Sequence, residues 1–301
     1  MAEAQPSQQH GKSNKTLIII SIISAFLILL CVLGGWAFWS ISQTKKAELQ
    51  RATDLYSTYN EQFLKSEETL KTTISSIQKS ENSAEISNET YQTLLDQTNS
   101  ESTAFTNVKN QSASSSDEIA KRITDSSNSI SIQLSKTNQA ILADQCGRNK
   151  LTRYQILEKE IDDTEKSLGQ YIIILDDSTA PKLITLSQKY KELSDVINNS
   201  IQCFDQAVLL TEDARNSFSK ESETYQKISD TLLRQSAVTN NVDQFNAIGK
   251  ERPTFFTVYF TKSVPLWLKT NRENIEERLL KIQIDHNDIS EFYKNLTGKR
   301  S

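Results

Sequence analysis

The sequence predicts an all-α protein in which a single N-terminal transmembrane helix precedes an elongated antiparallel helical bundle, a coiled-coil rod of about five helices. Three observations predict this fold. Residues 17–41 form one uncharged apolar run, apolar residues recur every seven positions over much of the remaining chain, and only seven Gly and four Pro interrupt 301 residues. We therefore expect a short polar tail at 1–15, an anchor at 16–41 and a helical stalk at 42–301.

The apolar run is long enough to cross a bilayer. A helix rising ~1.5 Å per residue needs about 20 apolar residues to span a hydrocarbon core of ~30 Å. Trp36, Phe38 and Trp39 cluster at its C-terminal end, as in the aromatic belt of a membrane interface. A cleaved signal peptide is the alternative, because Gly35 and Ala37 are small residues at the spacing that a signal peptidase reads. The length of the run favours a retained signal anchor in a single-pass protein of the cell membrane.

The flanking charges give two opposite indications of orientation. Lys12 and Lys15 precede the run, whereas Lys45, Lys46 and Arg51 follow it, and this count slightly favours a cytoplasmic stalk. A short polar N-terminus with two lysines before an apolar run is, however, typical of a signal anchor that sends the following domain outward. We expect an extracytoplasmic stalk.

Heptad patterning predicts the helices of the stalk. A first apolar row runs in steps of seven from Leu49 to Phe105, with eight apolar residues among nine positions. Its companion row is mostly small or polar, so neighbouring helices are needed to cover it. A second row runs from Leu183 to Thr239 and has an apolar companion row, as expected of a full heptad repeat. Shorter rows predict further helices around 119–141, 154–175 and 268–296.

The breaks between these rows determine the predicted layout. Turn-forming or polar residues mark breaks at 112–116, 146–149, 176–181 and 249–265. Short breaks force antiparallel reversals, and helix lengths at ~1.5 Å per residue then return the chain to the membrane near residue 250. We expect a distal four-helix section at approximately 80–215, a membrane-proximal section made of 42–79 and 216–301, and an aromatic membrane-proximal loop at 250–267.

Two cysteines lie at similar distances along the rod in this layout. The same arithmetic places Cys146 ~62 Å and Cys203 ~68 Å from the start of the stalk. Both are candidates for a disulfide, provided that the stalk lies in an oxidising compartment. The alternative is a pair of free thiols in an intracellular bundle.

The predicted loop at 250–267 carries most of the candidate site residues. Five aromatic side chains and three cations fall in or beside it. They predict a patch that inserts at the membrane interface or binds a protein partner, and the alternative is a hydrophobic cap on the end of the bundle. These residues are Phe255, Phe256, Tyr259, Phe260, Trp267, Arg252, Lys262 and Lys269.

Composition and motifs argue against several functional classes. The net charge is −4 and no basic stripe is present, so we expect no nucleic-acid partner. No glycine-rich phosphate loop, nucleophile constellation or metal-ligand spacing is recognisable, so we expect no catalytic residue, no metal and no cofactor. His286, the one histidine of the stalk, follows Ile282 by four residues and is expected at the boundary of the apolar stripe.

These features predict a membrane-anchored, non-enzymatic structural, tethering or interaction protein that presents a coiled-coil rod. Its expected partners are the lipid bilayer, a protein that the sequence does not identify, and a second copy of the chain. One alternative is an extracytoplasmic sensor acting through a membrane partner, since the distal bundle resembles in architecture the ligand-binding domains of bacterial receptors. The other is a cytoplasmic coiled-coil scaffold of the membrane. A pocket among the distal helices would favour the sensor, and a filled seam would favour the tether.

Overall fold

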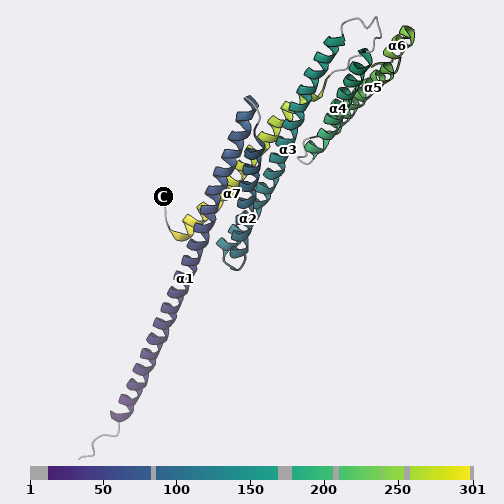
Figure 1. Ribbon diagram of the computed structural model, residues 1–301. Coiled ribbons are helices and arrows are strands. Elements are labelled where there is room, and N and C mark those ends of the chain that lie inside the picture. Colours follow the sequence, from purple (N-terminus) through teal and green to yellow (C-terminus); the bar gives the residue numbers. More distant parts are fainter. Residues whose placement is uncertain are drawn as a thin grey trace, which may run out of the picture.

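Every regular element that the structure describes is an α-helix, which confirms the all-α prediction (Figure 1). The computed structural model describes residues 13–82, 86–168, 178–205, 210–238, 240–253 and 258–298, and its side chains are described at Phe26 and from residue 29 onward, except at 80–82. The helices are α1 (Ser13–Asn82), α2 (Asn88–Ser112), α3 (Glu118–Leu168), α4 (Thr179–Asp205), α5 (Glu212–Ser236), α6 (Val242–Gly249) and α7 (Phe260–Thr297).

Two bundle sections lie end to end and share α3 and α7. The proximal section packs the second half of α1, α2, the first half of α3 and most of α7 around one core. The distal section packs the second half of α3, α4, α5 and the start of α7 around another. In Figure 1 the first half of α1 extends away from both sections, while α6 lies at the opposite end of the molecule. Because α3 and α7 run through both cores, bending between the sections would disturb the packing of two helices.

Most of the first predicted heptad row is buried, although it is divided between two helices and its first residue, Leu49, is exposed. Phe63, Leu70 and Ile77 of α1 and Phe105 of α2 are buried in the proximal core. Ser66 and Thr73 of its companion row are buried with it. Small side chains let helix backbones approach closely. The companion row, which has few apolar residues, is therefore covered by neighbouring helices.

Reciprocal serine pairs hold α4 and α5 together. The Ser187 hydroxyl donates to the Ser229 carbonyl at 2.9 Å, and the Ser229 hydroxyl donates to the Ser187 carbonyl at 2.8 Å. Ser194 and Ser222 repeat this exchange one heptad further along, at 2.8 and 3.0 Å. All four side chains are buried, and these bonds satisfy hydroxyls that would otherwise destabilise the interface.

Several of the predicted boundaries differ from the structure. The chain leaves the helix between α1 and α2, where residues 83–87 contain no Gly or Pro. The predicted helix over 182–247 is interrupted twice, between α4 and α5 and between α5 and α6. Conversely, α3 runs without interruption through 146–149. Ser87 and Thr211 accept backbone hydrogen bonds as N-caps of α2 and α5, but in a chain this rich in Ser and Thr such caps do not stand out.

The additional reversal at α4–α5 corrects the predicted layout. A continuous helix from 182 to 247 would have returned the chain to the start of the stalk, whereas α5 turns back and carries α6 to the far end (Figure 1). Residues 250–253 and 258–267 therefore lie at and below that far end rather than beside the anchor. The predicted four-helix section at 80–215 is likewise replaced by two sections that each use α3 and α7.

The predicted anchor lies in the extended first half of α1. Its backbone is helical from Ser13 onward, but most side chains of the anchor up to Ile28 lie outside the described residues. The described apolar ones, including Leu30, Leu33 and the three belt aromatics, are exposed. Within the part of the chain described, no helix combines the length and the apolar character needed to cross a bilayer. The membrane span stays a prediction.

Candidate functional site

The predicted aromatic patch is divided by the structure. Phe260 is fully buried, and Tyr259 and Trp267 pack against the distal core. Phe218 of α5 is their common neighbour, with ring centroids 5.4 Å from Phe260 and 4.8 Å from Trp267. Phe255 and Phe256 lie outside the described residues. Because the chain reverses between α4 and α5, Phe218 packs against these rings. The described rings therefore belong to the core of the distal section and are not available to insert into a membrane.

The three predicted cations also have different surroundings. Arg252 donates to the Glu165 carboxylate at 2.9 Å and to the Tyr190 hydroxyl at 3.1 Å. Lys262 and Lys269 are exposed on α7, and the Lys269 ammonium lies 3.8 Å from a Glu273 carboxylate oxygen. Arg252 therefore joins α3 to α4 and cannot also act as a free surface charge.

A buried carboxylate fixes the start of α7. One oxygen of Glu221, a residue of α5 that is 2% exposed, accepts hydrogen bonds from the backbone N–H groups of Tyr259 and Phe260, both at 2.9 Å. This is an N-terminal cap supplied by another helix, and it satisfies donors that have no partner within α7. Desolvation raises the pKa of Glu221, although those two hydrogen bonds oppose the rise. Its second carboxylate oxygen is buried without a hydrogen-bond partner.

An open pocket of about 400 Å³ lies between the helices of the distal section. Residues from α3, α4, α5 and the segment before α7 line it, so its shape depends on the packing of the whole section. The lining residues are Glu158, Ile161, Tyr190, Leu193, Tyr225, Ile228, Arg252, Pro253 and Val258.

Tyrosine hydroxyls around the pocket are engaged in hydrogen bonds. Tyr225 and Tyr154 join their hydroxyls at 2.8 Å, and the Tyr190 hydroxyl donates to Glu165 at 2.9 Å. Desolvation raises the pKa of Tyr190 to about 12, so its hydroxyl stays protonated at neutral pH. Partial desolvation also raises the pKa of Glu158, a lining carboxylate that forms no ion pair with the described residues. The pocket therefore presents tyrosine rings and one carboxylate that has no counter-charge.

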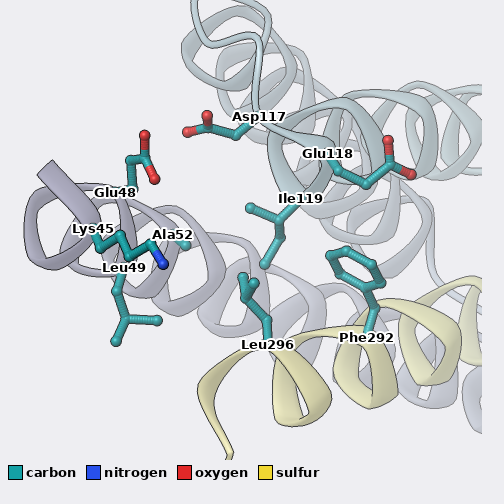
Figure 2. Close-up of a pocket in the computed structure, with 9 residues that line it drawn as sticks. All are labelled: Lys45, Glu48, Leu49, Ala52, Asp117, Glu118, Ile119, Phe292 and Leu296. Carbon is teal, nitrogen blue, oxygen red and sulfur yellow. The ribbon is translucent and has the colours of Figure 1, made fainter. Parts of the chain in front are cut away.

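A second pocket, of about 370 Å³, opens at the end of the proximal section that faces the predicted anchor (Figure 2). Figure 2 shows Ile119, Phe292 and Leu296 converging at its centre, with acidic side chains around them. It is lined by Lys45, Glu48, Leu49, Ala52, Asp117, Glu118, Ile119, Phe292 and Leu296. The Arg122 guanidinium lies 4.4 Å above the Phe292 ring and forms an ion pair with Glu118. The negative charge of this lining carboxylate is therefore already neutralised.

The two candidate cysteines form a disulfide. Cys146 in α3 and Cys203 in α4 are joined, with their Cα atoms 5.7 Å apart. Between the two helices Gly147 leaves room for the Phe204 ring, since a Cβ atom there would come within 2.8 Å of it. The absent side chain at Gly147 therefore permits the close approach of α3 and α4 beside the disulfide.

His286 sits at the seam between α1 and α7. Its ring stacks on Phe63 with centroids 3.8 Å apart, and its Nε2 lies 2.8 Å from the Asn60 amide oxygen. The described residues include no cluster of three or more His, Cys, Asp or Glu side chains that would hold a metal ion. His286 therefore acts as a packing residue in this part of the protein.

The seam should make stability sensitive to mild acid. Burial lowers the pKa of His286 below its usual value, while the nearby Glu67 carboxylate opposes this effect. At a pH between the folded and unfolded pKa values, the unfolded chain binds a proton that folded His286 does not. The stabilisation contributed by neutral His286 is therefore complete above pH ~6.5, and it is lost as the pH falls from there through the folded pKa. Urea unfolding at a series of pH values checks this. His286→Gln should flatten the pH dependence between neutral and mildly acidic conditions, and an unchanged slope would contradict the assignment.

Sequence reasoning missed the distal pocket because its residues also belong to the helical pattern. Tyr190 and Tyr225 are members of the second heptad row, and Glu158 and Glu221 look like ordinary polar positions of helices. Only the packing of four chain segments brings the pocket residues together, and two separate Tyr positions in the same row were the sole sequence signal. The chain matches no protein-family model, no curated protein and no solved structure.

Proposed function

We propose that this chain is a membrane-anchored tethering protein in which a non-enzymatic helical rod projects an interaction surface away from a bilayer. The continuity of α1 carries this proposal. Its described apolar side chains are exposed from Phe26 to Ile41, and the same unbroken helix is buried in the proximal core from Ala52 onward. A helix that is apolar on all sides and packs against nothing requires an apolar environment, which a bilayer supplies. The anchor and the rod are then one rigid element.

Further features are consistent with this role. Trp36, Phe38 and Trp39 are 65%, 77% and 60% exposed at the end of the apolar run, where interfacial aromatics are expected. The two sections extend along the direction of α1 (Figure 1), so the distal section is held far from the membrane. We propose that this end binds a protein partner, either a different protein or a second copy of the chain.

The disulfide favours an extracytoplasmic rod. Disulfides persist in oxidising compartments and are rare in the cytosol. Cys146 and Cys203 are joined and are located in the stalk. We therefore place the rod on the outer side of the membrane, which also agrees with the signal-anchor form of the N-terminus.

Membrane extraction tests the anchor. Full-length protein should stay in the membrane pellet after alkaline carbonate treatment. Leu30→Lys combined with Leu33→Lys should release it, because each charge at the centre of a span costs about 2.5–3.5 kcal/mol. Leu64→Lys combined with Leu280→Lys is the matched control, since both leucines are exposed on the rod. That control should remain in the pellet.

Two outcomes would overturn the proposal. Full-length protein that is released by carbonate has no spanning anchor. Retention of the Leu30/Leu33 variant would show that another part of the chain holds it to the membrane.

The distal pocket supports a second candidate function, that of an extracytoplasmic sensor. A cavity of about 400 Å³ formed by several helices is of the size that small-molecule sites have. A signal from it would pass along α3 and α7, which run through both sections, and then to a partner in the membrane.

A further inference from the structure

We propose that the distal pocket binds a small organic cation, an amine carried on an apolar or aromatic body. This proposal goes beyond the tethering role and does not rest on it. The pocket lies within the distal section, far from the predicted anchor, and its residues are drawn from four separate segments of the chain.

The shape and lining of the pocket suit an apolar body. Its volume of about 400 Å³ accommodates a small organic molecule. Ile161, Leu193, Ile228 and Val258 supply aliphatic surface from four segments. Burying an apolar group against such surface stabilises the complex by roughly 25 cal/mol per Å² before the cost of association.

The charges of the pocket favour a cation. Arg252, the one cation in the lining, is already paired with Glu165 at 2.9 Å. Glu158 forms no ion pair with the described residues, and after desolvation its negative charge is a further cause of the raised pKa of the buried Glu221 carboxylate. A bound ammonium group would reduce the repulsion between these carboxylates. A bound carboxylate would increase it, and would have to compete with Glu165 for Arg252.

The tyrosines add an attraction that does not depend on their hydroxyls. The hydroxyls of Tyr190 and Tyr225 are engaged by Glu165 and Tyr154, and the two rings stack on each other with centroids 5.9 Å apart in the wall of the pocket. The negative faces of aromatic rings attract cations, and quaternary and primary amines are recognised in this way. Arg252, with its guanidinium carbon 5.5 Å from the Tyr190 ring centre, already shows this type of contact at the rim.

Calorimetric titration of the full-length protein with phenethylamine tests the proposal. The isosteric probes 2-phenylethanol and phenylacetate carry the same ring with a neutral or negative group. Phenethylamine should bind measurably and both other probes at least ~10-fold more weakly. Glu158→Gln should weaken phenethylamine by at least ~10-fold without changing the fold, because this residue is exposed at the pocket.

Glu223→Gln is the matched control. Glu223 is also an exposed glutamate of the distal section, but it does not line the pocket. This variant should bind phenethylamine as the parent protein does. Three results would overturn the proposal: no heat with any of the probes, equal or tighter binding of phenylacetate, or equal affinity in the Glu158→Gln variant. Membrane extraction is unaffected by each of them, so the anchor is judged separately.

Discussion

Asp144→Ala is expected to lower the free energy of unfolding by about 3–5 kcal/mol, among the largest effects of any single substitution in the rod. Asp144 is 0% exposed, and its carboxylate accepts hydrogen bonds from the Arg148 Nε at 2.8 Å and from the Tyr91 hydroxyl. Alanine would leave the Arg148 guanidinium, whose side chain is 16% exposed, without that partner. A buried charge that loses its counter-charge keeps its desolvation cost.

Chemical denaturation in urea measures this effect, and Asp162→Ala is the matched control. Asp162 pairs with Lys166 at the same i, i+4 spacing on the same helix, but that pair is exposed. Exposed pairs contribute about 0–1 kcal/mol, so the control should unfold close to the parent midpoint. Equal losses in the two variants would show that burial of the Asp144 pair has no energetic consequence.

The position of Asp144 explains why sequence reasoning misplaced a boundary. Asp144, Cys146, Gly147 and Arg148 lie within little more than one turn of α3, where the two sections meet. Polar residues next to glycine are typical of a loop, and this spacing predicted one. In the structure these four residues contact, in order, Tyr91, Cys203, Phe204 and the Ile77 carbonyl of other helices. Partners distant in sequence cannot be read from the pattern, so a meeting point of helices was taken for a turn.

The opposite error occurred at the two unexpected reversals. The apolar row keeps its phase from Ile77 to Tyr91, so the period continues while the chain turns back. A seven-residue period reports which positions are buried, not which helix buries them. It therefore predicted the fold class and most core residues, but not the order in which helices reverse. The site depended on that order, since the reversal at α4–α5 moved the aromatic residues from the membrane end to the distal core.

Replacing both Cys146 and Cys203 with Ser is expected to lower the free energy of unfolding by about 4 kcal/mol. The two residues are 57 positions apart, and the disulfide restricts a loop of that size in the unfolded chain. The joined helices α3 and α4 also pack on either side of Gly147, so the bond holds the start of the distal section together. Urea unfolding with and without reductant measures the effect. Reductant should destabilise the parent protein and leave the double variant unchanged.

In cells the same bond reports the side of the membrane on which the rod lies. Cys31 is the remaining, free cysteine, and Cys31→Ser provides a background in which only the paired thiols react. A membrane-impermeant maleimide should label this variant on intact cells only after reduction, because the thiols are joined and face outward. Labelling that requires permeabilisation would place the rod in the cytoplasm. The bond would then have little chance to form, and the cytoplasmic scaffold would become the better-supported function.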